Sequence, residues 1–283
     1  MYVMTHVMEL RRVDGAAFTA EEAGPVLEAL HVGVSFALGR WTAPMLAVGQ
    51  DHAGNAAWED WRVFHCDPAQ ATAQGWWHQN DHQALGDLLS RVIPVFTDPA
   101  RRPVLRFQMM AAIAAMGDQG YADQRVMTGA SGLENFTWQA LVINGTLTKE
   151  QHRRAHAHDL LRTVLGNASI SAAIDAGVQP VVASYAAGER VRQGHELDAA
   201  EVAMQVRNRI VHPDEVTQRI YAREGLVKET WLLIRHYLVL LILHSLGYDG
   251  PYRDLRRIGG QASDRGVVPW AAPSPSSSGA PSS

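Results

Sequence analysis

The chain has 283 residues, of which 47% are hydrophobic and 19% charged, so it can bury a sizeable core and is too apolar to be disordered throughout. Its formal net charge of -4 excludes a basic coat for nucleic acid, and leaves only local patches as candidates for that role. The single cysteine excludes an internal disulfide and a thiolate metal cage. The longest strongly apolar run, residues 236–248, is too short to span a bilayer, and residues 1–14 lack the pattern of a signal peptide. A cytoplasmic protein without membrane contact is therefore expected.

Within the first hundred residues the sequence predicts both helices and strands. Residues 1–10 favour a strand, and the capping box of Thr19 and Glu22 predicts a helix that ends near residue 38. Two strand-like runs separated by turn residues predict a hairpin within residues 42–65. Four tryptophans close together indicate either the core of a small domain or an aromatic platform for a ligand. They are Trp58, Trp61, Trp76 and Trp77.

From residue 81 onward the periodicity is helical. One helix is expected to stop at a break from Pro94 to Pro99, and another covers residues 104–116. The predicted fold class is α+β, with a change of domain near residue 100. The alternative is that the first hundred residues pack into the helical part through the helix at 104–116. The predicted parts are a mixed sensing or positioning domain at 1–100, a helical bundle at 101–252, and a basic stretch with a disordered Ser/Pro-rich tail at 253–283.

Four helices are predicted within the bundle. The first ends at Asn144 and Gly145, and the second starts at the capping box of Thr148 and Gln151. The fourth is apolar around most of its circumference, which is typical of a helix buried in a bundle or in a dimer interface. The first helix covers residues 123–143, the second starts near 149, the third covers 198–211, and the fourth runs from Pro213 towards Leu246.

A pattern with chemical meaning lies where the third helix meets the fourth. Arg207 and His212 are five residues apart, and Asn208 follows the arginine. Two other Arg–His pairs have the same spacing, so only the added asparagine makes this copy specific. Proline after His212 disfavours a helical conformation at that histidine and places the imidazole at a bend. A neutral imidazole beside a guanidinium suits RNA cleavage, because the base takes a proton from a 2′-hydroxyl and the cation stabilises charge on the phosphate, without a metal.

The segment RNRIVH, from Arg207 to His212, resembles the motif of the HEPN superfamily. The order of four helices, the GLE at residues 132–134 and the LGYDGPY that ends the last helix are similar to ApeA-like HEPN proteins of bacterial phage defence. The resemblance implies a four-helix bundle and a metal-independent endoribonuclease that needs no cofactor, acting in phage defence or a toxin-like stress response. It also implies a homodimer with one composite site, in which Arg207 and His212 are catalytic and Asn208 is the polar member of the motif.

Alternatives remain open for each of these residues. Arg207 and His212 can instead be a surface pair that closes a helix end. Glu134 is either an orienting carboxylate or a solvated residue at the flank of its helix, and Arg209 is either helix surface or a phosphate contact. A HEPN module that binds RNA or a protein without cutting is the second candidate function.

Two further groups are weaker candidates. His152, His156 and Asp159 share one face of the predicted second helix and are suited to zinc, but no fourth ligand or internal general base accompanies them, so no metal is expected. His78 and His82 form a weaker pair. A small basic patch for RNA is expected just after the last helix. Its members are Arg253, Arg256, Arg257 and Arg265.

Overall fold

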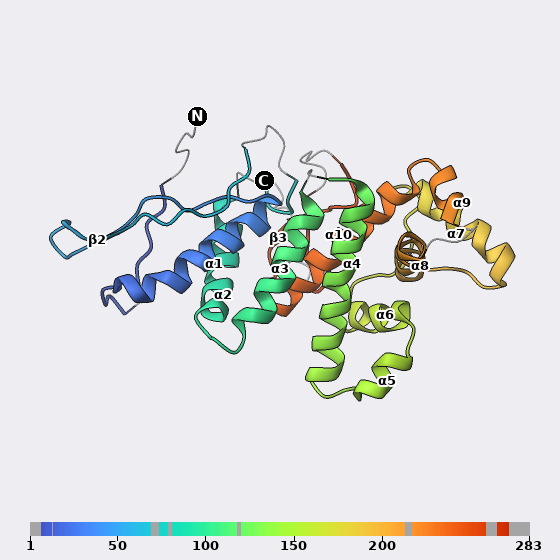
Figure 1. The fold of residues 1–283 in the computed structure, drawn as a ribbon, viewed down its shortest axis with the longest axis horizontal. Helices are drawn as coiled ribbons and strands as arrows, with labels where there is room; N and C mark the ends of the chain where they lie inside the picture. Colours follow the sequence, from blue (N-terminus) through green and yellow to red (C-terminus); the bar gives the residue numbers. More distant parts are fainter. Residues whose placement is uncertain are drawn as a thin grey trace, which may run out of the picture.

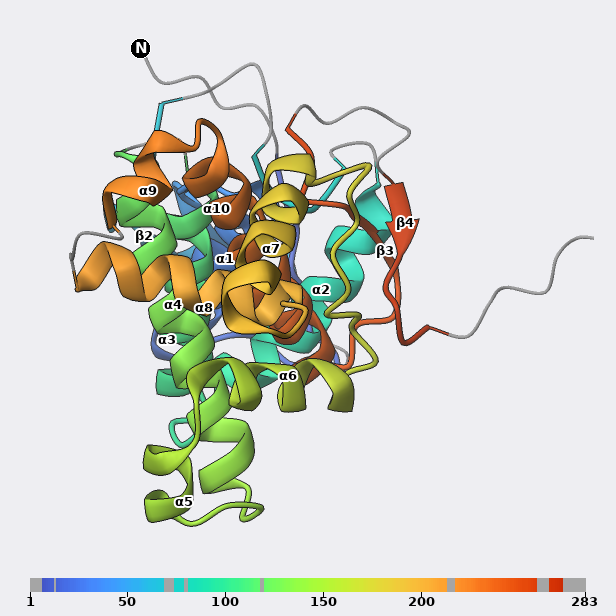
Figure 2. The same cartoon turned by 90° about the vertical axis from the view of Figure 1, so that its right-hand side faces the viewer.

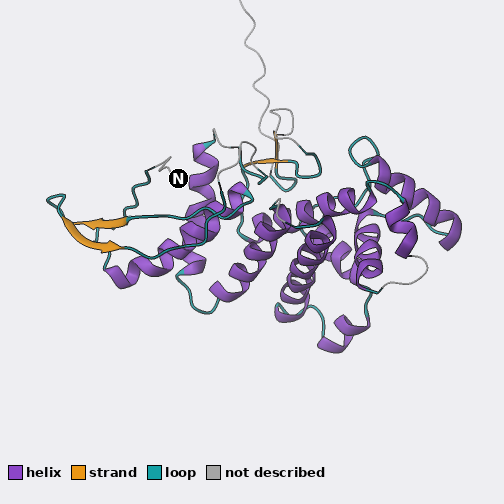
Figure 3. Cartoon of the chain, turned by 45° about the horizontal axis from the view of Figure 1, so that its top comes forward, coloured by secondary structure: helices purple, strands orange, loops and turns teal. Residues whose placement is uncertain are grey.

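A computed structural model of the chain describes residues 7–12, 14–68, 74–78, 81–117, 120–212, 217–258 and 265–271. Within these ranges the fold is of the α+β class, as predicted, with helices forming most of it and two small two-stranded sheets (Figure 3). The helices are α1 (Ala20–Leu38), α2 (His82–Phe96), α3 (Arg102–Met116), α4 (Ala122–Trp138) with a π-helical end η1 (Gln139–Ile143), α5 (Lys149–Arg154), α6 (Ala157–Asn167), α7 (Pro180–Gln193), α8 (Ala199–Val211), α9 (Thr217–Ala222) and α10 (Leu226–Ser245). The strands are β1 (Ala47–Gln50), β2 (Ala56–Asp60), β3 (Pro251–Arg253) and β4 (Arg265–Val267).

The N-terminal elements follow the predicted order. The capping box at the start of α1 is confirmed, because the Thr19 hydroxyl accepts the Glu22 N–H at 3.2 Å and the Glu22 carboxylate accepts the Thr19 N–H at 2.9 Å. Strands β1 and β2 form the expected antiparallel hairpin, which projects beyond α1 at one end of the molecule (Figure 1). Residues 1–6 of the predicted first strand lie outside the described residues, and residues 7–10 are not in a strand.

The four tryptophans do not form one platform. Trp76 and Trp77 are buried in the main core, whereas Trp61 is 72% exposed. Trp58 is half-buried on the hairpin and donates its indole N–H to the Phe18 carbonyl at 3.1 Å. The cluster therefore divides between core packing and hairpin attachment.

The predicted break between two helices is confirmed, although it begins at Thr97 and not at Pro94. Pro94 lies inside the last turn of α2, which ends at Phe96. A proline is tolerated at this position because it removes only one hydrogen bond of the helix. The Thr97 hydroxyl then donates to the carbonyls of Ile93 and Pro94, both at 3.1 Å.

Helix α10 occupies the centre of the molecule, with α3, α4, α7 and α8 arranged around it (Figure 2). All fourteen of its residues from Thr230 to Leu243 are buried within the single chain. Its apolar circumference is therefore covered without a partner, and it provides no argument for a dimer. None of the described helices combines the length and apolar character needed to cross a membrane.

The predicted fourth helix is two helices in the structure. α9 ends at Ala222, and α10 starts only at Leu226, after Gly225. Gly225 has φ of 86°, a left-handed conformation that breaks the helix and that glycine adopts without strain. The predicted start at Pro213 to Glu215 lies outside the described residues, as do residues 272–283 of the predicted tail.

Helix α4 approaches α10 so closely that a side chain at either of two glycine positions would force neighbouring side chains to move. A Cβ at Gly129 would lie 2.6 Å from Ile234 Cγ2, and one at Gly132 would lie 2.7 Å from Leu238 Cδ2 and 3.0 Å from Ala111 Cβ. The buried stripe predicted for this helix is confirmed. Its members are Val126, Ala130, Leu133, Thr137 and Leu141.

We expect Gly132→Ala to destabilise the protein by about 1–3 kcal/mol, because the added methyl overpacks the contact between α4 and α10. Gly86 is the matched control, since it lies in the interior of α2 and a Cβ there meets nothing within 4 Å. Gly86→Ala should stabilise by up to about 1 kcal/mol through helix propensity alone. Denaturant unfolding of both variants measures the difference, and equal effects would contradict the close approach.

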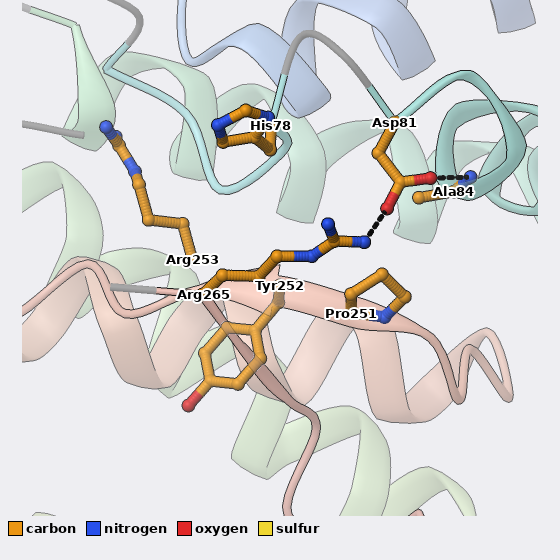
Figure 4. Close-up of a pocket in the computed structure, with 7 residues that line it drawn as sticks. All are labelled: His78, Asp81, Ala84, Pro251, Tyr252, Arg253 and Arg265. Atoms are coloured by element: carbon orange, nitrogen blue, oxygen red, sulfur yellow. Dashed lines mark hydrogen bonds and ion pairs between the residues drawn. The ribbon is translucent and has the colours of Figure 1, made fainter. Parts of the chain in front are cut away.

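The segment after α10 returns to the N-terminal half of the chain. The Trp76 ring meets the Tyr248 ring edge-on at 5.2 Å, and the Arg253 N–H donates to the Trp76 carbonyl at 2.8 Å. Arg265 forms an ion pair with Asp81, whose other carboxylate oxygen caps the first turn of α2 (Figure 4). Core residues on both sides of residue 100 belong to one cluster, and the division into domains at that point stays a prediction.

A buried histidine lies between α10 and this returning segment. The His236 side chain is 6% exposed, and its Nδ1 lies 3.3 Å from Asp254 Oδ1. Burial lowers the pKa of His236 to about 4, although the charge of Asp254 opposes the shift. The folded protein therefore holds this imidazole in its neutral form at pH 7.

Stability should consequently fall as the pH drops from about 6.5 towards 4. In this window the unfolded chain protonates His236 and the folded protein does not, a difference of up to about 3 kcal/mol. His236→Gln removes the titration and should flatten the dependence. Denaturant unfolding at pH 7 and pH 5 checks this, and the same loss in wild type and variant would show that other groups cause it.

Candidate functional site

Two of the residues predicted from the sequence meet between helices α4 and α8. Arg207 Nη2 lies 2.8 Å from Glu134 Oε1, with the arginine side chain 23% exposed and the glutamate side chain 41% exposed. Both helices are anchored by buried apolar faces, α4 through Leu133 and α8 through Met204, so the contact joins two fixed elements. Of the two interpretations of Glu134, the contact favours the orienting carboxylate.

The neighbouring residues of the motif lie at the end of α8. Arg207 Nη1 also donates to Asn208 Oδ1 at 2.9 Å, which fixes the guanidinium from a second side. His212 is the C-cap of α8, with φ of -118° and ψ of 79°, and its N–H donates to the Asn208 carbonyl at 2.8 Å. The predicted bend at His212 is confirmed, and its side chain is exposed.

Arg209 is not plain helix surface. Its side chain is 18% exposed, with Nη1 hydrogen-bonded to the Tyr185 hydroxyl and 3.5 Å from Glu189 Oε1. Its guanidinium also lies over the Tyr185 ring, 5.5 Å from the centroid. These contacts attach α8 to α7, a helix that the sequence analysis missed although Pro180 at its start and Gly194 at its end are ordinary helix boundaries.

A groove opens beside the ion pair of Glu134 and Arg207. Helices α4, α5, α6 and α8 enclose a volume of about 210 Å³ there. Its polar members are Glu134, Thr137 and His152, with the Thr137 hydroxyl 3.5 Å from His152 Nε2. Its apolar members are Leu133, Ala155, Ala157, Leu160, Leu161 and Met204. No pattern in the sequence indicated this groove, because four separate elements form it.

The single helix face on which the zinc alternative depended does not form. The chain leaves the helix at Ala155, so His152 lies on α5 while His156 is the N-cap of α6, and the face shared by the three residues does not form. Among the described residues no group of three His, Cys, Asp or Glu side chains is arranged to hold a metal ion. His78 lines a small hollow of about 10 Å³ beside Asp81, and His82 starts α2 (Figure 4).

The predicted basic patch after the last helix does not form as a patch. Arg253 is 6% exposed, and Arg256 is paired with Asp254 at 2.7 Å. Arg265 is paired with Asp81. Arg253 and Arg265 attach the C-terminal segment to the rest of the fold, Arg256 is neutralised within the segment, and Arg257 is exposed.

Two regions of the chain match family models, and Glu134, Arg207 and His212 lie in the second of them. The model of the YopA central domain matches residues 1–72, and that of the YopA C-terminal domain matches residues 105–263. The chain belongs to the YopA family. It is 24% identical over 274 residues to the SPbeta prophage-derived uncharacterized protein YopA of Bacillus subtilis (strain 168). That alignment covers 95% of this chain and 58% of the relative, so the chain spans little more than half of that YopA protein. No solved structure matches.

Proposed function

We propose that this member of the YopA family is a metal-independent endoribonuclease of HEPN type, acting on RNA in the cytoplasm. The observation that carries the proposal is the arrangement at the end of α8. Glu134 and Asn208 hold the guanidinium of Arg207, and His212 is exposed at the bend five residues later. A fixed cation and an accessible imidazole are the two groups that cleavage by a 2′-hydroxyl needs.

The chemistry assigns one role to each group. The neutral imidazole of His212 takes the proton of a ribose 2′-hydroxyl, and the resulting oxyanion attacks the adjacent phosphorus. Arg207 stabilises the charge that develops on the non-bridging oxygens. The bond from phosphorus to the 5′ oxygen breaks, and that oxygen takes up a proton from solvent. The products are a 2′,3′-cyclic phosphate and a 5′-hydroxyl.

A two-fold homodimer is part of the proposal. In a regular helix, residues five apart are separated by roughly 140° around the axis and about 7.5 Å along it. Arg207 accordingly contacts α4 through its ion pair with Glu134, while His212 is exposed at the C-terminal end of α8. Pairing two copies near this end would bring the imidazoles and guanidiniums of both into one composite site. Full RNA cleavage by a strictly monomeric protein at micromolar concentration would contradict this part.

A module that binds RNA or a protein without cutting is the second candidate. The observation in its favour is that Arg207 is already engaged by Glu134 and Asn208, as in a purely structural pair. Either function fits a role in phage defence, and the only support for that role beyond the HEPN resemblance is the prophage origin in the relative's description.

Incubating the purified protein with RNA in EDTA separates these candidates. Cleavage that leaves a 2′,3′-cyclic phosphate, with no cutting of an all-deoxy strand of the same sequence, is the result expected of the ribonuclease. Binding of RNA without cleavage would support the module. Activity that appears only after a divalent metal is added would contradict the proposed chemistry.

A further inference from the structure

We propose that the groove between α4, α5, α6 and α8 binds a guanine base. Its volume of about 210 Å³ is below that of sites for drug-sized ligands, about 300 Å³ and above, and suits a single ring system. The floor is apolar, with Leu133, Leu161 and Met204 almost fully buried. A flat heterocycle can cover such a floor while its polar edge meets the rim.

The rim offers a ring surface and a carboxylate. The His152 imidazole is half-buried and stands edge-on to Trp138, with ring centroids 5.1 Å apart. The Thr137 hydroxyl also lies 3.5 Å from Nε2 of this imidazole, so two residues of α4 contact the ring. A ring in this position provides a surface on which a base can stack.

Glu134 supplies the selectivity for guanine. An ionised carboxylate only accepts hydrogen bonds, and its two oxygens have about four acceptor positions, so Glu134 can bind Arg207 and a ligand together. Guanine presents two parallel donors on one edge, N1–H and N2–H, which match a carboxylate. Adenine, cytosine and uracil each present fewer donors there and place an acceptor beside them.

The position of the groove favours a nucleotide over a peptide side chain. Glu134 lines the groove and is bonded to Arg207, so a base in the groove would place its phosphate towards the guanidinium and the end of α8. The inference rests on the proposed ribonuclease function for this use of the phosphate. Binding of the base itself does not depend on cleavage.

Binding of 5′-GMP and 5′-AMP to the full chain, measured by saturation-transfer NMR and titration calorimetry, tests the inference. GMP should bind about 10-fold more tightly than AMP, because of the hydrogen bonds to a charged carboxylate, and 5′-IMP, which lacks the N2 amine, should fall between them. Glu134→Gln should abolish the preference. Equal affinities for GMP and AMP would overturn the assignment.

A pair of matched variants places the binding in the groove. Ala155 is exposed and lines the groove, so Ala155→Trp should fill it and abolish GMP binding. Ala114 is exposed on α3, outside the groove, and Ala114→Trp should bind GMP as the wild type does. Thermal unfolding shows that both variants are folded. Undiminished GMP binding by Ala155→Trp would refute the groove as the site.

The same experiments separate this inference from the ribonuclease. GMP binding is measured without RNA, so its result does not depend on cleavage. If GMP binds in the groove and no RNA is cut, the base site stands and the ribonuclease fails. If RNA is cut without regard to sequence and GMP does not bind, the base site fails alone. If both hold, cuts should lie next to guanosines, and Ala155→Trp should lose that preference.

Discussion

Replacing His212 by alanine should slow RNA cleavage by about 10²- to 10⁴-fold while the protein keeps its stability. The loss follows from removing the imidazole that takes the 2′-hydroxyl proton. The fold should survive because the side chain is exposed, and the hydrogen bond from the His212 N–H to the Asn208 carbonyl is a backbone bond that alanine retains. Single-turnover cleavage and thermal unfolding of the same preparation measure both effects.

His82→Ala is the matched control for this experiment. His82 is exposed at the first position of α2, away from α8, and its removal should change neither cleavage nor stability. If His212→Ala cuts RNA as fast as the wild type, the proposed general base is wrong. If it unfolds instead, His212 has the structural role of closing the end of α8.

Deleting residues 1–99 should abolish cooperative folding. Four large side chains from this part are fully buried in the cluster that also contains the centre of α10. Each contributes about 1.5–3 kcal/mol by burial, and together they approach the whole stability of an ordinary domain, about 5–15 kcal/mol. They are Phe36, Trp76, Leu88 and Phe96. The packing thus favours the alternative in which the first hundred residues complete the helical core.

Calorimetry and size-exclusion chromatography of the truncated chain check this expectation. We expect no single unfolding transition and an aggregated product, because the deletion also removes Trp76 and Asp81, which hold the segment around Tyr248 and Arg265. Deleting residues 272–283, a stretch without large apolar side chains, should leave the transition unchanged. A single cooperative transition in the chain lacking residues 1–99 would instead establish an independent helical domain.

Local signals in the sequence predicted the ends of several helices correctly. The capping boxes at Thr19 and Thr148, the stop at Gly145 and the end of α8 at His212 are all where the sequence places them. Each depends on hydrogen bonds or backbone preferences among residues close together in the chain. Such interactions involve only residues close in sequence, so they can be read without knowing the tertiary packing.

Interruptions within apolar or helical stretches were harder to predict. The sequence analysis extended one helix through Ala155 and another through Gly225, and it began the break after α2 at Pro94 instead of Thr97. A helical pattern of side chains continues across a short break, and a proline in the last turn of a helix removes only one hydrogen bond. The composition around these points therefore looks the same for a broken helix and an intact one.

The candidate site shows the same division. The sequence by itself determined that Arg207 and Asn208 precede a bend at His212 near the end of a helix. Only the tertiary structure decided that Glu134 meets Arg207, that a groove lies beside them, and that α10 is covered within one chain. These contacts join residues far apart in sequence, and they depend on how close α4, α8 and α10 approach one another. That spacing is set by the sizes of all the side chains packed between the helices, such as the missing side chain of Gly132, and no local pattern reports it.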